Sequence, residues 1–339
     1  MKCAVIFGGT GFIGSFFAKY LLDNDCFGKV YLVDIESSFS KKSKFRTREL
    51  ESDTRIEFVS IDVKLLNENF RPPEDIILIA NFAAIHREPG HEISEYFDTN
   101  ILGAENVCKW ANFVGCKDII FTSSIAPYGP SEVAKLEVST PTPTTAYGSS
   151  KLAAEKIHCI WQATDRKNRN LTIVRPGVVF GPGEGGNVSR LIKAIIGRYF
   201  VYMGNRKTRK AGIYVKELCH AMWWISEQQK NNGQGMVLFN MSMNSAPTIE
   251  EYVNVVCEVS EIKRFIPNLP FFIVISLSYF ITFILAIFSL EHAFKPTRIR
   301  KLVRSNNIIP GVLADYGYTY KYTLVEAFQD WKKCCPEEW

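Results

Sequence analysis

The stretch FGGTGFIGS, residues 7–15, follows a short apolar segment and opens a segment with helical periodicity. Its glycines Gly9, Gly11 and Gly14 have the spacing G-x-G-x-x-G, which is typical of a strand–helix turn that binds a dinucleotide. Side chains at these positions would keep a pyrophosphate away from the helix N-terminus, where backbone N–H groups bind anions. Asp34 ends the next apolar segment, twenty residues after Gly14. A carboxylate there accepts hydrogen bonds from both ribose hydroxyls, so these residues together predict a dinucleotide site.

The carboxylate of Asp34 also distinguishes between the two common dinucleotides. It repels a 2′-phosphate, so the sequence favours NAD over NADP. Lys41, Lys42 and Arg46 follow closely enough to keep NADP as the alternative. Asp62 ends the third apolar segment, where a side chain can bind the adenine edge, and a simple surface turn is the competing interpretation.

Six short, nearly all-apolar segments alternate with segments of helical periodicity. This pattern is typical of parallel strands that helices cover on both faces. It predicts an α/β fold with a doubly wound parallel (Rossmann) sheet and right-handed crossovers. The pattern loosens after Pro176, so we expect a dinucleotide-binding domain at 1–176, which also receives part of 210–245, and a smaller C-terminal substrate lobe at 177–339. The six predicted strands are 3–7, 30–35, 56–61, 75–82, 118–123 and 171–176.

The composition narrows the possible classes of function. The 339 residues are 47% hydrophobic and 22% charged, as in an ordinary globular protein. A net charge of +5 without a long basic run gives no support for nucleic-acid binding. The nine cysteines are scattered and none of their pairs has zinc-ligand spacing, which predicts reduced thiols in a cytosolic protein and no metal site. The N-terminus does not have the pattern of a signal peptide.

A tyrosine and a lysine stand four residues apart in TAYGSSKLAAEK, on one face of a predicted helix: Tyr147 and Lys151. An unperturbed tyrosine, with a pKa of about 10, is a poor base at neutral pH. A nearby ammonium, reinforced by the positive nicotinamide, stabilises the phenolate and lowers this pKa. The lysine can also hold the nicotinamide ribose. On its own the pair is common on solvated helices.

A serine-rich loop, FTSSIAPYG at 121–129, precedes this helix. Ser124 in the loop can share a substrate hydroxyl with Tyr147. The order of glycine-rich turn, Asp34, Ser124, Tyr147 and Lys151 is hard to obtain by accident. We therefore predict Ser124, Tyr147 and Lys151 as the catalytic set.

With these motifs the sequence resembles the extended short-chain dehydrogenase/reductase family over nearly its whole length, and in particular the family's sugar epimerases and dehydratases. The resemblance implies NAD as the cofactor. It implies Asn100 as the family's structural active-site asparagine, and Ala83 and Ala84 as residues that line the cofactor groove. It also implies cofactor contacts at Gly8, Phe12, Ile13, Asp62, Val63 and Pro176, and a substrate contact at His86. The matching segments are GGTGFIG, Asp62–Val63, NFAAIH (81–86), TNILGAEN (99–106), FTSSIAPYG, YGSSK and RPGVVFGPG (175–183).

The family's reactions can be narrowed further. Its members oxidise a sugar hydroxyl with NAD or run the reverse reaction, mostly on nucleotide-diphosphate sugars. Dehydratases and decarboxylating relatives carry acidic residues directly after the position of Ser124, whereas this chain has Ile125 and Ala126, which move no protons. The resemblance therefore favours a 4-epimerase. A 4-keto-sugar reductase, a 3β-hydroxysteroid-type dehydrogenase and a non-catalytic nucleotide-binding member stay as alternatives, and the intact catalytic set argues against the last.

Three further residues are implied as contacts of the substrate, at its diphosphate. Asn187, in GEGGNVSRLIKAI, matches the asparagine that family epimerases place near the substrate diphosphate, at the start of a helix. Arg209 and Lys210 align with the family's phosphate-binding arginine, and which of them serves stays open. The implied substrate is a hexose or N-acetylhexosamine linked through a diphosphate to uridine or to polyprenol.

The segment FFIVISLSYFITFILAIFSL, residues 271–290, contains twenty residues without a charge, which is long enough to cross a bilayer. A single crossing would separate the rest of the chain from 317–331, which resembles the family's final helix. We therefore expect 271–290 to form a helix or helical hairpin that dips into one leaflet, within a hydrophobic membrane-associating segment at 265–296; a conventional span and a buried core helix or dimer contact are the alternatives. Ser278, Thr282 and Ser289 lie within about 40° of one another on a helix and could face protein.

Basic residues flank this segment on both sides and suit anionic headgroups. The sequence thus predicts a cytoplasmic protein that is peripherally or monotopically associated with the inner face of the membrane. The resemblance also implies a homodimer, formed through helices at about 94–115 and 146–167. The flanking basic residues are Lys263, Arg264, Lys295, Arg298, Arg300, Lys301 and Arg304.

Overall fold

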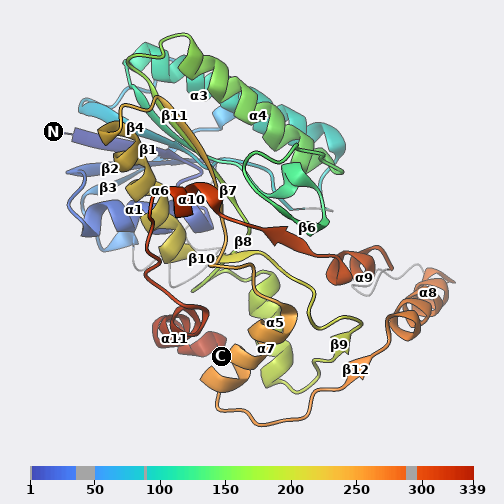
Figure 1. Ribbon diagram of the computed structural model, residues 1–339. Coiled ribbons are helices and arrows are strands. Elements are labelled where there is room, and N and C mark those ends of the chain that lie inside the picture. The colour runs from blue at the N-terminus through green and yellow to red at the C-terminus, as the bar shows by residue number, and fades with distance from the viewer. Residues whose placement is uncertain (1, 36–49, 88–89, 288–295) are drawn as a thin grey trace.

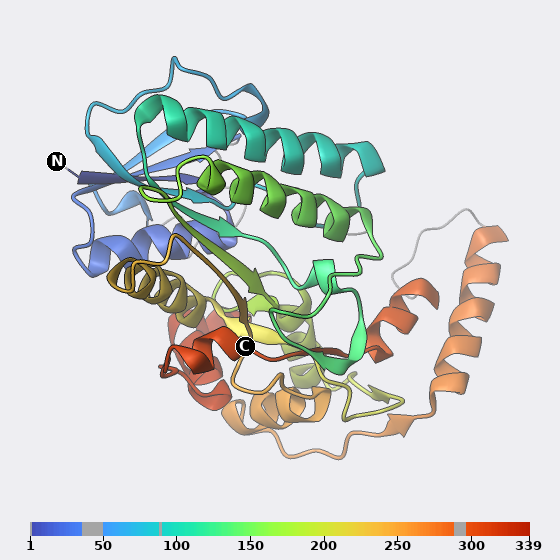
Figure 2. The same cartoon turned by 45° about the horizontal axis from the view of Figure 1, so that its top comes forward.

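The protein is built around one parallel sheet, seen from two directions in Figures 1 and 2. The computed structural model describes residues 2–35, 50–87, 90–287 and 296–339. Within them a seven-stranded sheet has the order β11-β7-β5-β4-β1-β2-β3, and all of its pairs are parallel. The strands are β1 (Lys2–Phe7), β2 (Lys29–Asp34), β3 (Ile56–Ser60), β4 (Asp75–Asn81), β5 (Asp118–Thr122), β7 (Asn170–Pro176) and β11 (Met236–Met241).

This sheet confirms the predicted α/β fold with a parallel Rossmann sheet. All six predicted strands are present, with ends that differ from the prediction by at most one residue. The seventh strand, β11, is a correction to the predicted number. It pairs with β7 at the edge of the sheet, and its register runs from Met236 opposite Leu171 to Met241 opposite Pro176.

Helices cover both faces of the sheet, which is why its strands are apolar throughout. In β1, Cys3, Val5 and Phe7 are buried in the core on one face, while Ala4 and Ile6 are buried in the core on the other. Figure 2 shows two long helices side by side over the first face. The first core is covered by α3 (Ile93–Val114) and α4 (Ala146–Ala163), and the second by α1 (Phe12–Asp23) and α6 (Val215–Asn231).

Shorter elements gather below the sheet in Figure 1. There an aromatic cluster joins β8 (Val178–Phe180), β10 (Gly212–Tyr214) and α11 (Leu324–Cys334), because the Phe180 ring lies 5.2 Å from that of Phe328 and 5.9 Å from that of Tyr214. β8 pairs with β10, and β6 (Ser131–Lys135) pairs with β13 (Asn306–Ile308). Other short elements of the chain are α5 (Asn187–Ile196), α7 (Ile249–Val259), α10 (Gly311–Asp315) and the 3₁₀ helix η4 (Pro336–Glu338).

The final helix differs from its prediction at 317–331. It begins only at Leu324, because Thr323 caps its N-terminus in a capping box with Glu326. Gly317, with a φ of 72°, ends the preceding helix α10 in the left-handed conformation. The residues between them form no regular element.

The apolar segment projects to the right in Figure 1. The chain enters it through β12 (Asn268–Leu269), which pairs with β9 (Tyr202–Met203), so the residues of 265–296 that directly precede the uncharged run are extended. The helix α8 (Phe271–Ile287) follows, and α9 (Pro296–Val303) packs against it. Ser289 and Lys295 lie outside the described residues. Among the residues that the structure describes, no helix is both long and apolar enough to cross a membrane.

Candidate active site

The glycine-rich turn brings two stretches of backbone closer together than side chains would allow. Gly8 has a φ of 73°, and a Cβ there would lie 2.7 Å from the backbone nitrogen of Ala83. A Cβ on Gly14 would collide with the carbonyl oxygen of Gly8. Gly11 is the N-cap of α1 and has no side chain that could bind the N–H groups of the first turn. This turn, which includes Phe12 and Ile13, also holds no acidic residue. The N–H groups at this helix end therefore suit the pyrophosphate of NAD.

Asp34 is held against this turn. Its Oδ2 accepts hydrogen bonds from the Oγ1 (2.6 Å) and the backbone N–H (3.2 Å) of Thr10, and its Oδ1 accepts one from the N–H of Ile35 (2.8 Å). The carboxylate thus lies at the end of β2 beside the glycines, where the ribose role predicted for it requires it. Lys41, Lys42 and Arg46, on which the NADP alternative depends, lie outside the described residues.

Asp62 and Val63 have contacts that explain them without a ligand. The Asp62 Oδ1 accepts a hydrogen bond from the backbone N–H of Lys64 at 2.9 Å and caps the short helix η2 (Val63–Leu65). The Val63 side chain is buried against Gly103 of α3. These bonds agree with the competing interpretation of Asp62 as a turn residue, and a contact of Asp62 with the adenine edge stays a prediction.

The loop that carries Ala83, Ala84 and His86 is tied down by Asn100. Asn100 is buried on α3, and its Oδ1 accepts from the backbone N–H of Ile85 at 2.9 Å. Its Nδ2 donates to the Ile85 carbonyl (3.1 Å) and to the Ser150 Oγ (2.9 Å) on α4. One amide therefore joins the loop after β4 to both long helices.

The three predicted catalytic residues lie at two elements that touch. Ser124 follows β5, and its Oγ accepts a hydrogen bond from the N–H of Ala126 at 3.1 Å. Tyr147 and Lys151 occupy the first two turns of α4, which begins because Thr145 caps it through the N–H of Gly148 (3.1 Å). A Cβ on Gly148 would lie 2.7 Å from the Ala126 carbonyl oxygen, so the start of α4 lies directly on the Ser124 loop.

Lys151 is buried, with 2% of its surface exposed, and its Nζ lies 4.4 Å from the centre of the Phe121 ring. Burial lowers the pKa of Lys151 to about 7, while the charge of Glu155 acts in the opposite direction. The positive charges of Arg87 and Lys151 also lower the pKa of His86, after the larger effect of desolvation by the surrounding protein, although the His86 side chain is exposed on one side. The lysine can therefore exchange a proton near neutral pH, and His86 lies within its electrostatic range.

A buried carboxylate, which the sequence motifs did not predict, lies one turn beyond Lys151. Glu155 is 1% exposed, and its Oε1 accepts hydrogen bonds from the Ser123 Oγ (2.5 Å) and the Arg175 Nε (2.8 Å). Its Oε2 accepts one from the Arg175 Nη2 at 2.6 Å. The available signal was the spacing of Tyr147, Lys151 and Glu155, which places all three on one helical face.

The start of α5 differs from a simple anion site. Asn187 is its first residue, and the Asn187 Oδ1 accepts a hydrogen bond from the Arg190 Nη2 at 2.6 Å. The Oε2 of Glu184 accepts from the N–H (2.9 Å) and the Oγ (2.5 Å) of Ser189. A carboxylate of the chain itself therefore already neutralises part of the positive helix end, and a diphosphate would share this position with it.

Arg209 and Lys210 lie beside the chain that leaves β7. The Val178 N–H donates to the carbonyl of Ala211 at 2.9 Å, which places the basic pair one or two residues from this contact. The Arg209 Nη1 donates to the Ala246 carbonyl (2.6 Å), and the Lys210 Nζ donates to the Arg304 carbonyl (2.5 Å).

Burial lowers the pKa of Lys210 to about 8, and the charge of Glu132 opposes this shift. The pair is thus close to Pro176, the final residue of β7, whereas Asn187 belongs to a separate element.

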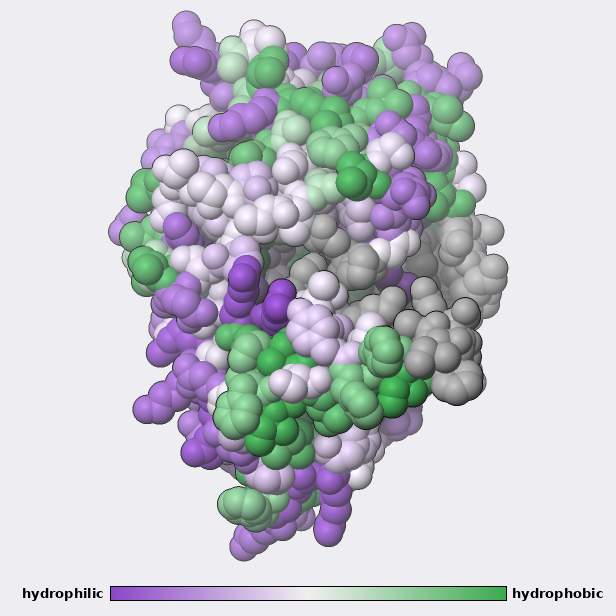
Figure 3. Space-filling view, turned by 90° about the vertical axis from the view of Figure 1, so that its right-hand side faces the viewer, coloured by the Kyte–Doolittle hydropathy of each residue, from purple (hydrophilic) through white to green (hydrophobic). Residues whose placement is uncertain are grey.

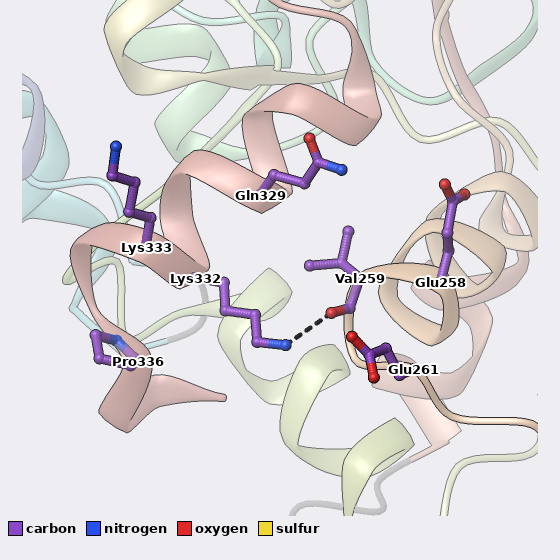
Figure 4. Close-up of a pocket in the computed structure, with 7 residues that line it drawn as sticks. All are labelled: Glu258, Val259, Glu261, Gln329, Lys332, Lys333 and Pro336. Atoms are coloured by element: carbon purple, nitrogen blue, oxygen red, sulfur yellow. Dashed lines mark hydrogen bonds between the residues drawn. The ribbon is translucent and has the colours of Figure 1, made fainter.

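A surface hollow of about 480 Å³ lies elsewhere, between α7 and α11 (Figure 4). Glu258 near the end of α7 and Glu261 just beyond this helix lie on one side, and Lys332 of α11 reaches across from the other side, where its Nζ donates to the Val259 carbonyl at 2.8 Å. None of the predicted site residues lines it. The residues that do are Glu258, Val259, Glu261, Gln329, Lys332, Lys333 and Pro336.

The parallel sheet and the glycine-rich turn at the start of α1 define the class of dinucleotide-binding Rossmann proteins. The model of the family described as "NAD dependent epimerase/dehydratase family" matches residues 4–241, well over half of the chain. The chain belongs to this NAD-dependent enzyme family, which confirms the expected resemblance, the expected cofactor and the expectation of an enzyme.

Two curated relatives and one solved structure illustrate the likeness. The N-acetyl-alpha-D-glucosaminyl-diphospho-ditrans,octacis-undecaprenol 4-epimerase of Escherichia coli O157:H7 is 29% identical over 266 residues, which cover 78% of each chain. The UDP-glucose 4-epimerase of Lacticaseibacillus casei is 36% identical over 162 residues, which cover 46% of each chain. A UDP-N-acetylglucosamine 4-epimerase from Methanobrevibacter ruminantium M1 superimposes over the whole of both chains with a TM-score of 0.75 and 20% identity, a likeness of fold.

Proposed function

We propose that this protein is an NAD-dependent 4-epimerase of a hexose or N-acetylhexosamine linked to a diphosphate carrier. The observation that carries the proposal is the placement of Tyr147 and Lys151 in the first two turns of α4, directly against the loop of Ser124. This constellation belongs to a chain of the NAD-dependent epimerase/dehydratase family. The two curated relatives described above both carry names of 4-epimerases.

In this reaction Tyr147 acts as the base and then as the acid. Its phenolate accepts the proton of the sugar 4-hydroxyl, while the Ser124 hydroxyl hydrogen-bonds the same oxygen. The ammonium of Lys151, one helical turn further along α4, stabilises the phenolate in this proposal. NAD, held by the glycine-rich turn and Asp34, would supply reversible hydride transfer at C4 of the sugar. Tyr147 then returns the proton to the new hydroxyl oxygen.

The loop after Ser124 supports epimerisation over elimination. Ile125 and Ala126 occupy the positions at which a dehydratase needs acids, and Ala126 is the first residue of the short helix η3 (Ala126–Tyr128). Neither side chain can move a proton. The reaction that this site supports is therefore hydride transfer with a single acid/base residue.

The basic pair is our proposed site for the diphosphate, within a substrate lobe at 177–339. Lys210 and Arg209 lie beside the residues that follow Pro176, so a diphosphate there would leave the sugar pointing toward the carboxyl ends of the strands. The Asn187 side chain would assist from α5. The carrier is uridine or polyprenol, and an NMR time course with sugars on each carrier distinguishes the two.

The segment α8–α9 gives a reason to include a membrane in this proposal. Phe272, Phe280 and Phe283 are exposed over 60–68% of their surface and lie within about 80° of one another around α8. Figure 3 shows hydrophobic side chains gathered on this face of the molecule. On the opposite side of α8, Val274 and Ser278 are buried.

The polar groups of α8 and α9 fit the same picture. The Ser278 and Thr282 hydroxyls donate to carbonyls of their own helix at 2.7 Å, so they need no water or protein partner. Arg300 of α9 is exposed and donates to the Tyr279 hydroxyl at 2.8 Å. We propose that α8 dips into one leaflet at the cytoplasmic face while α9 meets anionic headgroups.

We also propose a homodimer through the outer faces of α3 and α4. These faces carry the exposed apolar side chains of Leu102 and Ile160. Two copies that pack these helices together would remove this apolar surface from water.

The experiment that tests the proposed reaction is an NMR time course in mild detergent with no added cofactor. The purified protein is mixed with UDP-hexoses, UDP-N-acetylhexosamines and their polyprenyl diphosphate counterparts. A new anomeric signal without net NADH is expected from one carrier series and identifies that carrier. Silence across the panel rejects the epimerase and favours the 4-keto reductase or sterol dehydrogenase, which would then be assayed with added cofactor.

A further inference from the structure

A buried carboxylate links the helix of the proposed catalytic residues to two strand ends. Glu155 lies on α4 two turns beyond Tyr147 and one turn beyond Lys151. Its partner Ser123 directly precedes Ser124 at the end of β5, and its partner Arg175 directly precedes Pro176 at the end of β7. Glu155 thus contacts the residue before Ser124 and the residue before Pro176.

The two strand ends are also joined to each other. The Ser123 N–H donates to the carbonyl of Val174 at 2.8 Å, and the Ile125 N–H donates to the carbonyl of Pro176 at 3.1 Å. The backbone on both sides of Ser124 is therefore fixed to β7. The position of α4 relative to this pair of strands is set at the catalytic end by the Glu155 contacts and by the approach of Gly148 to Ala126.

We propose that Glu155 is a positioning residue, which holds Tyr147 and Lys151 in register with Ser124 through its bonds to Ser123 and Arg175. The inference rests on the proposed function, because Ser124, Tyr147 and Lys151 are the groups that it aligns. Rigid alignment matters because small displacements of reacting groups cost large factors in rate.

The charge of Glu155 has a second consequence at the same site. Glu155 and Arg175 form an ion pair whose side chains are 2% and 4% exposed, so water does not screen their charges from Lys151. The Glu155 carboxylate raises the pKa of Lys151 against the larger lowering caused by burial. Its removal should favour loss of protons from the Tyr147–Lys151 pair. The charged and titratable groups that face this pair are Glu155 and His158 on α4, His86 on the loop after β4, Tyr96 on α3 and Arg175 on β7.

The test compares Glu155→Gln and Ser123→Ala with wild type in the full chain. In Glu155→Gln we expect kcat to fall about 10- to 100-fold with KM and bound NAD unchanged, and the pH optimum to move about one unit lower. Ser123→Ala keeps the ion pair, so we expect about a 3- to 10-fold fall in kcat and an unchanged pH optimum. Glu155→Asp restores the charge and should restore the pH optimum.

A matched control exists at the opposite end of the same strands. The Asp118 carboxylate joins β5 to Asn170 of β7 (2.7 Å) and to Lys230 of α6 (2.6 Å). Asp118→Asn should lower stability and leave kcat and the pH optimum as in wild type. A second readout, the near-ultraviolet phenolate titration of Tyr147 measured against Tyr147→Phe, should show a lower apparent pKa in Glu155→Gln.

The outcomes separate this inference from the proposed function. Folded Glu155→Gln with wild-type kcat and wild-type Tyr147 titration overturns the positioning role. Should Glu155→Gln fail to fold, wild-type kcat in Ser123→Ala overturns it instead. A wild-type protein that epimerises no sugar rejects the proposed function alone, and the tyrosine titration then decides the role of Glu155.

Discussion

Asn100 of α3 binds both the N–H and the carbonyl of Ile85, at 2.9 and 3.1 Å, and so holds one residue of the cofactor-side loop by its backbone. The same amide donates to the Ser150 hydroxyl of α4. This hydroxyl donates in turn to the Tyr147 carbonyl at 2.9 Å. A single buried side chain therefore connects the loop of Ala84 with the first turn of α4. Asparagine suits this position because it offers a donor and an acceptor together.

Replacement of Asn100 by alanine should loosen this connection. It leaves partly buried backbone groups of Ile85 without the Asn100 amide, which should lower the free energy of unfolding by about 1–3 kcal/mol. We also expect a fall in retained NAD and in kcat. Chemical denaturation and the NAD content of the purified protein measure both effects. Asn106→Ala is the control, since Asn106 lies on the same helix and donates only to the Val63 and Lys64 carbonyls among its described bonds. Equal loss of NAD in both variants would contradict the role of Asn100.

Lys151→Met should abolish turnover and yet stabilise the cofactor-free protein in a pH-dependent way. Burial lowers the pKa of Lys151 from its ordinary value of 10.5 to about 7. Below about pH 7 the lysine is charged in the folded and the unfolded chain, so its buried charge destabilises the wild type fully. Between about pH 7 and 10.5 the unfolded chain binds the extra proton, so the stability of the wild type rises with pH.

The advantage of Lys151→Met over wild type should therefore be largest near pH 6 and shrink toward pH 10. Urea unfolding of both proteins at several pH values measures it. Lys109→Met on α3 serves as control, because its side chain is 72% exposed and should show no such window. A constant difference between wild type and Lys151→Met across this range would show that the lysine titrates normally.

Tyr147→Phe should keep NAD bound and lose turnover by a factor of about 10² to 10⁴, because it removes the acid/base group and leaves the ring in place. The ring of Tyr96, on α3, lies 6.4 Å from that of Tyr147, and the Tyr96 hydroxyl donates to the Arg87 carbonyl. Tyr96→Phe is therefore a close control that should retain most of the activity. Full turnover in Tyr147→Phe would exclude the mechanism proposed here.

The strands were predictable because burial on both faces makes every residue of a central parallel strand apolar, as in Val5 and Ile6 of β1. The glycine-rich turn was equally clear, since Gly8 and Gly14 face backbone atoms that leave no room for a Cβ. β11 was missed because it is an edge strand whose first residue, Met236, is 45% exposed and whose surroundings lack the regular alternation. Local pattern is strongest where the fold imposes burial on consecutive residues.

The site was predictable only as far as motifs reach along the chain. Tyr147 and Lys151 share a helix, so their proximity follows from a spacing of four. The pairing of Glu155 with Arg175 joins a helix to a strand twenty residues later, and no local rule links them. In the same way, the bond between Glu184 and Ser189 at the start of α5 depends on the path of a glycine-rich loop. Contacts of this kind depend on the path of the chain in space and not on the spacing of residues along the sequence.

Replacement of Phe272, Phe280 and Phe283 by serine should weaken membrane binding and leave the catalytic reaction intact. Each phenylalanine contributes about 1.5–3 kcal/mol when its side chain leaves water, so the triple variant should bind anionic vesicles at least tenfold more weakly. The same variant should turn over a UDP-sugar at the wild-type rate, if the protein accepts that carrier, because α8 lies outside the catalytic set. Vesicle co-sedimentation with and without anionic lipid measures the binding.

Val133→Ser/Val138→Ser is the control for this variant, since both valines are highly exposed, at 74% and 92%, and belong to β6 and to the chain after it rather than to α8. It should bind vesicles as the wild type does. Arg300→Glu should reduce binding to anionic vesicles and have little effect on neutral ones, because its contribution is electrostatic and is screened by salt. If the triple serine variant still sediments with vesicles like the wild type, α8 does not enter the leaflet, and its apolar face covers protein instead.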